Sequence, residues 1–141
     1  MIVLDTNVLS ALMQQAPEPR VVAWLDAQPT ESIWTTSVTV FEIRFGLEAM
    51  AKGKQQRTLQ EAFLLALTED LSGRVLNFDV AAADEAAVLS ARLRAKGRPV
   101  EIRDVMIAGI VAARRGTLAT RNTKHFRDTK IRLVNPWDDG E

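Results

Sequence analysis

Short apolar runs alternate with longer segments of helical periodicity along the chain. Residues 2–4 (Ile-Val-Leu) form a β-branched-rich run that is typical of a strand buried on both faces. After this run Val8, Leu9, Ala11 and Leu12 fall on one face of a helix. The pattern therefore predicts a buried strand, a tight turn and a helix.

The same alternation continues along the sequence. Further strands are predicted at residues 32–35, 75–78, 118–120 and 131–134, and helices at residues 21–28, 37–50, 55–71, 81–96 and 102–116. Ser37 and Asp79 stand where helix-capping side chains are expected. This alternation predicts an α/β fold with three layers (α/β/α), in which helices flank a short, mostly parallel central sheet. No repeat or linker divides the sequence, so residues 1–141 are expected to form a single domain.

Composition narrows the chemistry more than the fold. The chain has 141 residues, no Cys and one His, which excludes thiolate nucleophiles, iron–sulfur clusters and the usual Cys/His zinc sites. Its 18 basic and 18 acidic residues balance, so the net charge does not indicate a nucleic-acid partner. Without a long apolar run or a secretion signal, a cytoplasmic location and no membrane partner are expected.

Four groups of polar side chains follow or adjoin the predicted strands. Asp5 ends the first strand, Glu42 lies in the helix after the second, Asp104 begins a helix, and residues 120–122 follow the fourth strand. Ligands of parallel α/β sheets bind at the carboxyl ends of the strands. Carboxylates that converge there repel each other unless a cation lies between them, and oxygen ligands suit Mg²⁺ or Mn²⁺. The pattern indicates a metal site able to hydrolyse a phosphodiester.

Each of these residues also has a simpler structural explanation. Asp5 could only cap the first helix, and Asp104 could lie in a first helical turn because the helix dipole favours an acid there. Asn122 could only begin a turn. No single position is diagnostic, and the hypothesis depends on their combination.

A basic segment lies near the end of the chain. Between Arg114 and Arg132 there are seven basic residues and one acidic residue, Asp128, which is a net charge of +6. The segment is either a solvated face or a surface that contacts a phosphate-bearing ligand. We predict that Arg121 and Lys124 lie nearest the scissile phosphate, and that His125 packs or makes a polar contact instead of acting as a general base.

Four ordered segments resemble the PIN-domain family, and within it the VapC-like toxins of toxin–antitoxin pairs, including the FitB-like branch. These segments are Val-Leu-Asp-Thr-Asn at 3–7, Ser-Val-Thr-Val-Phe-Glu-Ile at 37–43 with Gly46 after it, Asp104 before Ile107-Ala108, and Leu-Ala-Thr-Arg-Asn at 118–122 leading to His125-Phe126. The resemblance covers nearly the whole chain and implies a PIN-like fold.

The resemblance also implies roles for the site residues. Asp5 and Asp104 would be the main ligands of Mg²⁺, with Mn²⁺ as a substitute, and Glu42 would contribute directly or through bound water. Thr120 would orient water or a ligand with its hydroxyl. Asn122 occupies the position of a fourth acid in many relatives, which implies a lower charge at a second metal position.

The implied partners are an RNA substrate, a small antitoxin and a second copy of the chain in a homodimer. We hypothesise that the apolar faces at residues 45–50 and 59–67 form part of an antitoxin groove; ordinary core packing is the alternative. Two other functions remain open: a PIN-like module that binds an antitoxin or RNA without turnover, and a phosphate-accepting receiver domain, for which only Asp79 lies near a suitable strand end.

Overall fold

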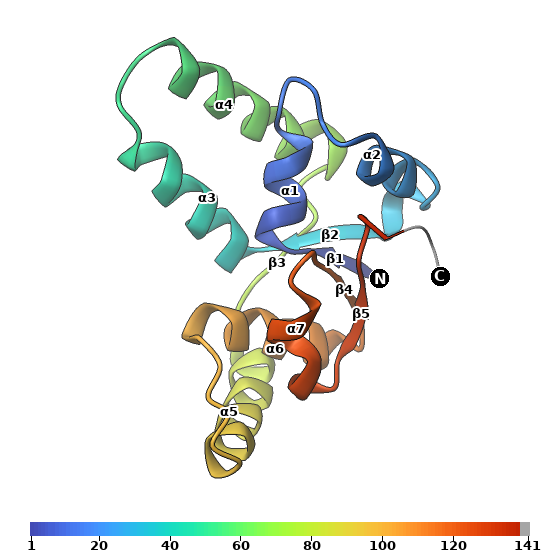
Figure 1. The fold of residues 1–141 in the computed structure, drawn as a ribbon, viewed down its shortest axis with the longest axis vertical. Helices are drawn as coiled ribbons and strands as arrows, with labels where there is room; N and C mark the ends of the chain where they lie inside the picture. The colour runs from blue at the N-terminus through green and yellow to red at the C-terminus, as the bar shows by residue number, and fades with distance from the viewer. Residues whose placement is uncertain (139–141) are drawn as a thin grey trace.

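A five-stranded, entirely parallel sheet forms the centre of the computed structural model, which describes residues 1–138 (Figure 1). In sheet order the strands are β3 (Val75–Leu76), β2 (Ile33–Thr36), β1 (Ile2–Leu4), β4 (Thr117–Ala119) and β5 (Arg132–Val134). The order departs from the chain order at β1, whose neighbours are β2 and β4. The predicted parallel sheet is confirmed, and β1 lies at its centre.

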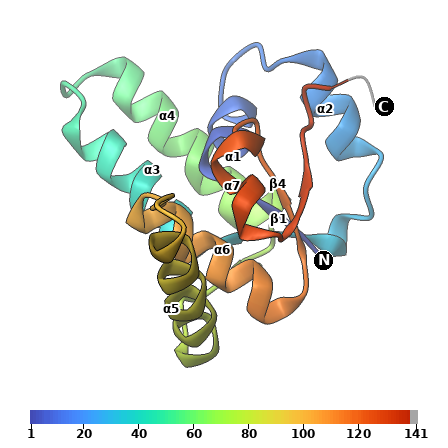
Figure 2. The same cartoon turned by 60° about the horizontal axis from the view of Figure 1, so that its bottom comes forward.

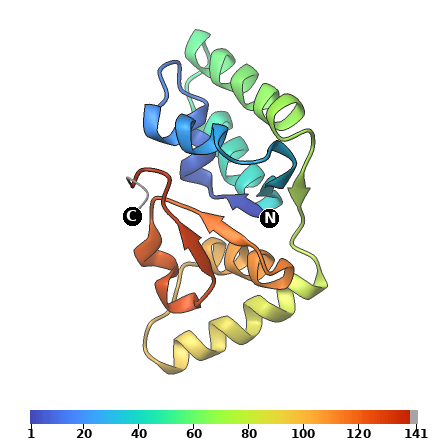
Figure 3. The same cartoon turned by 90° about the vertical axis from the view of Figure 1, so that its right-hand side faces the viewer.

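Helices cover both faces of this sheet, as Figures 1 and 3 show from two sides. One layer holds α1 (Thr6–Leu12), α2 (Pro19–Asp26), α3 (Ser37–Ala49) and α4 (Lys54–Leu65), and the other holds α5 (Val80–Ala95), α6 (Ile102–Arg114) and α7 (Thr123–Phe126). Three shorter turns, of 3₁₀ or π geometry, are formed by Thr30–Ser32, Ala66–Asp70 and Arg127–Thr129. The predicted three-layer α/β/α fold is confirmed.

Two apolar clusters hold these layers against the sheet. Val3 belongs to the cluster under α5 and α6, whereas Leu4, the next residue of β1, belongs to the cluster under α1 to α4. Successive side chains of a strand point to opposite faces, so a strand buried on both sides contributes to both clusters. This explains why residues 2–4 are apolar without alternation.

Close packing of α5 against α6 positions the beginning of α6 (Figure 2). A Cβ atom added at Gly109 would lie 2.6 Å from the Ala82 carbonyl oxygen and 2.8 Å from the Ala86 Cβ. Only glycine allows the two helix backbones to approach this closely. Asp104 lies in the first turn of the helix that is fixed in this way.

The structure corrects three details of the sequence prediction. Thr36, not Ser37, caps α3: its extended backbone lets its hydroxyl accept from the Thr39 N–H at 3.0 Å, whereas Ser37 is already helical. The strand predicted at 75–78 stops at Leu76, where its partner β2 also ends. The helix predicted at 55–71 changes to a π turn after Leu65. Asp79 caps α5 as predicted, accepting from the Ala82 N–H at 2.9 Å.

Nowhere in residues 1–138 does a helix combine the length and the apolar character needed to cross a membrane.

Candidate active site

Asp5 occupies the carboxyl end of the central strand, where the topology brings the most elements together. Its side chain is only 5% exposed and accepts hydrogen bonds from the Thr6 N–H (2.8 Å), the Thr120 hydroxyl (2.7 Å) and the Asn7 amide (3.2 Å). Burial raises the pKa of Asp5, and these three hydrogen bonds act in the opposite direction. A carboxylate held in this way is oriented but poorly solvated, as a metal ligand often is.

Thr120 and Asn7 join the segments that follow β1 and β4. Besides donating to Asp5, the buried Thr120 hydroxyl accepts from the Asn122 N–H at 3.1 Å and from the Asn7 amide at 3.4 Å. The Asn7 side-chain oxygen accepts from the Arg121 N–H at 3.1 Å. Because β1 and β4 are neighbouring parallel strands, their carboxyl ends meet at the same edge of the sheet. Sequence reasoning gave Asn7 no role of its own at the site and missed this bridge.

Glu42 approaches the same edge from α3. Its Oε1 accepts from the Thr6 hydroxyl at 2.8 Å, and its Oε2 lies 3.6 Å from a guanidinium nitrogen of Arg103 on α6. The Thr6 hydroxyl also lies 3.1 Å from that of Thr39. Glu42 is therefore fixed between the segment after β1 and the beginning of α6. Sequence reasoning did not single out Thr6 or Arg103, because their contacts join residues far apart in the chain.

Asp104 is the most strongly perturbed carboxylate of the site. Burial and the negative charges of Asp5, Glu101 and Glu42 raise its pKa from 3.8 to about 6, while His125 acts in the opposite direction. The His125 Nδ1 lies 3.7 Å from Asp104 Oδ2, which agrees with the expected polar contact of this histidine. Asp5 after β1, Glu42 on α3 and Asp104 on α6 therefore lie close enough for Asp104 to sense the charges of the other two.

The donor set suits an open magnesium or manganese site better than a closed one. Among residues 1–138, no three or more Asp, Glu, His or Cys side chains gather closely enough to hold a metal ion. Mg²⁺ commonly keeps several waters and takes one or two carboxylates together with substrate phosphate oxygens. Asp5 and Asp104 are hard oxygen donors whose charges are unfavourable without a cation, so their chemistry fits such an ion.

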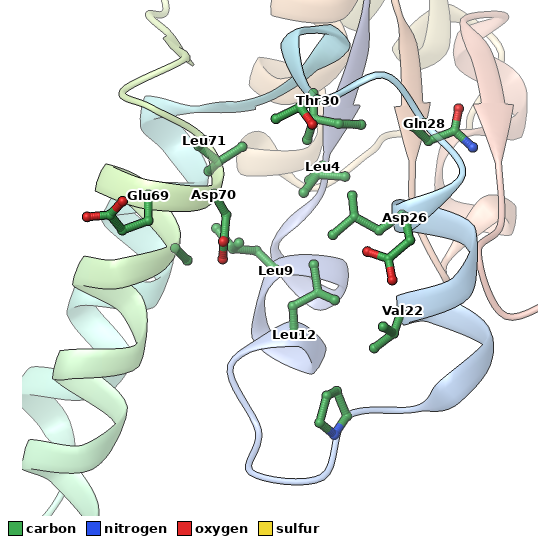
Figure 4. Close-up of a pocket in the computed structure, with 14 residues that line it drawn as sticks. Leu4, Leu9, Leu12, Val22, Asp26, Gln28, Thr30, Glu69, Asp70 and Leu71 are labelled. Carbon is green, nitrogen blue, oxygen red and sulfur yellow. The ribbon is translucent and has the colours of Figure 1, made fainter.

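Two of the cavities differ in their relation to the carboxylates. A cavity of about 330 Å³ is lined by Asp104, Lys124 and His125, so Lys124 shares a cavity with one candidate ligand, and its contact with RNA stays a prediction. A larger cavity of about 440 Å³ lies between α1, α2 and the π turn, with Leu9 and Leu12 pointing into it (Figure 4). None of the candidate carboxylates lines this second cavity.

Two of the predicted site residues, Arg121 and Asn122, have side-chain surroundings that differ from a direct place beside the carboxylates. The Arg121 side chain lies over the Trp137 ring, with its guanidinium carbon 4.9 Å from the ring centroid. The Asn122 side chain is exposed and forms no hydrogen bond within residues 1–138, although its backbone N–H reaches Thr120. Neither side chain is held against Asp5 or Asp104 by a direct contact in this part of the chain.

The fold and site define a three-layer α/β/α protein with carboxylates gathered at the carboxyl edge of a parallel sheet. The chain belongs to the PIN-domain family, whose match covers residues 2–131. It is 39% identical to the VapC ribonuclease Y4jK of Sinorhizobium fredii (98% of this chain, 99% of the relative) and 34% identical to the toxin FitB of Neisseria gonorrhoeae (99% and 100%). The solved structure of FitAB bound to a DNA fragment has a TM-score of 0.90 at 33% identity, covering 100% of this chain and 99% of that one.

These comparisons confirm the resemblance to VapC-like and FitB-like PIN proteins and exclude the receiver domain. Asp79, which that alternative needed as an acceptor, caps α5 and pairs with Arg114 at 2.9 Å.

Proposed function

We propose that this chain is an endoribonuclease that uses Mg²⁺, or Mn²⁺ as a substitute, to hydrolyse RNA phosphodiesters, and that it acts as the toxin of a toxin–antitoxin pair in the cytoplasm. One observation carries the proposal: Asp104 lies part-buried at the carboxyl edge of the sheet within electrostatic reach of Asp5 and Glu42, and burial together with the charges of Asp5, Glu101 and Glu42 raises its pKa to about 6. A relative named as a ribonuclease, 39% identical, and another named as a toxin, 34% identical, both over nearly the whole chain, support it.

In this mechanism Asp5 and Asp104 would hold the ion, and Glu42 would contribute directly or through water. The chemistry supplied by a bound ion would be a lower pKa of a water and compensation of charge on the phosphate. The Thr120 hydroxyl fixes the orientation of Asp5 through its 2.7 Å hydrogen bond, and Lys124, beside Asp104, offers a positive charge to the substrate.

Two contacts hold Glu42 ready for this role. The Thr6 hydroxyl donates to one oxygen of Glu42 and the Arg103 guanidinium lies beside the other, so the Glu42 carboxylate keeps one orientation. In the place of a fourth acid, Asn122 provides no negative charge, so a second metal position would bind its ion more weakly.

Metal-dependent cleavage can be tested with matched substitutions. Purified wild type should cut RNA with Mg²⁺ or Mn²⁺ and stop in EDTA, and Asp5→Asn and Asp104→Asn should each lower the rate by at least about 100-fold. Asp84→Asn, in an exposed position of α5, is the matched control and should cut normally. RNA binding without cleavage under any metal condition would instead favour a binding module without turnover.

The proposed partners are a small antitoxin and a second copy of the chain. Phe45 and Leu64 are 62% and 61% exposed, which supports a partner on these helices, but Leu47 and Phe63 are buried in the core. The proposed antitoxin groove is therefore limited to the exposed positions, and a charge at Phe63 would unfold the protein. Phe45→Glu and Leu64→Glu should weaken antitoxin binding in a folded protein; unchanged affinity would contradict the groove.

A further inference from the structure

Arg121 and Trp137 form a cation–π pair that has no part in the proposed metal chemistry. The guanidinium carbon lies 4.9 Å from the centre of the indole ring. Trp137 is half-buried and packs against the apolar cluster under α1 to α4. Its N–H donates to the Asn135 side chain and its carbonyl accepts from Arg20, both at 2.9 Å. The Trp137 ring is thus held by apolar packing, and its backbone is held by two hydrogen bonds.

Arg121 is fixed from a second direction, next to the carboxylates. Its N–H donates to Asn7 at 3.1 Å, and it directly follows Thr120, whose hydroxyl is bonded to Asp5. The Arg121 side chain is exposed, and no carboxylate of residues 1–138 forms an ion pair with it. A planar cation is therefore presented to solvent one residue from Thr120, with its backbone held by Asn7 and its guanidinium over the Trp137 ring.

We propose that the Arg121–Trp137 pair is a stacking platform for one unpaired base of the RNA, beside the scissile phosphate. The inference rests on the proposed function in that it takes RNA as the substrate. A guanidinium held over an indole ring leaves its other side open to a base, and unpaired RNA bases are commonly bound by arginine planes and aromatic rings. A phosphate contact alone needs neither the planarity of Arg121 nor the ring beneath it.

This platform has a consequence for the choice of substrate. Every base has a π face, so stacking tolerates any base identity. Bases in duplex RNA are already stacked on their neighbours and cannot reach a platform on the protein surface. We therefore expect a preference for single-stranded loops and ends near the cleaved bond, largely independent of the base at the platform.

The test measures binding and not cleavage. A fluorescent single-stranded RNA of ten nucleotides is titrated in EDTA with the wild type, Arg121→Lys and Trp137→Phe, followed by anisotropy. The titration is repeated with one abasic ribose moved through the RNA. Arg127→Lys is the matched control, because it makes the same exchange at another exposed position of the basic segment.

For the wild type we expect the abasic ribose at one position to weaken binding about tenfold. Arg121→Lys should bind the intact RNA about tenfold more weakly and lose its sensitivity to that abasic position, although its charge is kept. Trp137→Phe, which keeps a smaller ring, should retain part of the sensitivity, and Arg127→Lys should behave as the wild type.

A flat abasic scan in the wild type, or an Arg121→Lys variant with unchanged RNA affinity, would overturn the platform and leave the nuclease proposal intact. A platform used only by a protein partner would give this same flat scan. Absence of any RNA binding would overturn both proposals. Binding with an abasic-sensitive position but without metal-dependent cleavage would support the platform and overturn only the nuclease.

Discussion

Asp104→Asn should stabilise the metal-free protein at neutral pH, because the substitution removes a carboxylate that the folded state holds at a cost. The pKa of Asp104 is raised from 3.8 to about 6 by burial and by the charges of Asp5, Glu101 and Glu42. The folded protein therefore binds this proton more tightly than the unfolded chain does. Stability from this group is complete below about pH 4 and is lost as the pH rises to about 6.

The size of the effect follows from the same pKa. The displacement from 3.8 to about 6 corresponds to a ceiling of ~3 kcal/mol. The side chain keeps 26% of its exposure, so solvent screens part of this repulsion. The amino end of α6 also favours the charged form, and this attraction, worth ~0.3–1 kcal/mol, is lost in the variant. A net gain of about 1 kcal/mol in the free energy of unfolding remains.

Urea denaturation in EDTA measures this gain at pH 7.5 and at pH 4. Asp104→Asn should exceed the wild type by about 1 kcal/mol at pH 7.5 and by almost nothing at pH 4, while Asp84→Asn stays close to the wild type at both. Saturating Mn²⁺ should reverse the order, since only the wild type gains binding energy. A variant that is less stable than the wild type at pH 7.5 in EDTA would refute the argument that these carboxylates repel each other.

Three further tests, each with its own substitutions, examine separate parts of the structure. Gly109→Ala should lower the free energy of unfolding by ~1–3 kcal/mol because its methyl group would overlap α5. Gly46→Ala is the control and should raise the free energy of unfolding by ~0.5–1 kcal/mol, because no atom lies within 4 Å of the new methyl group. Equal shifts of the two melting temperatures would contradict the packing argument. Thr120→Val should weaken Mn²⁺ binding by ~10–100-fold in calorimetry, with Thr120→Ser restoring it, because the Asp5 carboxylate loses its shortest hydrogen bond. Asn122→Asp should tighten Mn²⁺ binding or add a second site in the same titration; an unchanged isotherm would remove Asn122 from the metal position.

The sequence predicted the fold well where local signals were strong. The apolar run before Asp5 and the Asp79 cap of α5 each depend on neighbouring residues, and both are confirmed. The cap of α3 was wrong by one residue because Thr36 and Ser37 both carry hydroxyls, and only the backbone geometry selects between them. Similarly, no local signal separates buried Phe63 from exposed Leu64.

The sequence predicted the charged residues of the candidate site better than the residues that contact them. Asp5, Glu42 and Asp104 were found from residue type, position and family resemblance, and their electrostatic coupling agrees with this. The contacts of Thr6 with Glu42 and of Arg121 with Trp137 join separate segments, so a single sequence without an alignment gives no signal for them.

The position of the central strand has a consequence for when the protein can fold during its synthesis. β1 pairs with β4, and the Thr120 hydroxyl that orients Asp5 comes 115 residues later in the chain. A nascent polypeptide therefore lacks one neighbour of its innermost strand, and one hydrogen-bond donor to its first carboxylate, until most of it has left the ribosome. Fragments released early would lack the sheet edge at which the proposed site assembles.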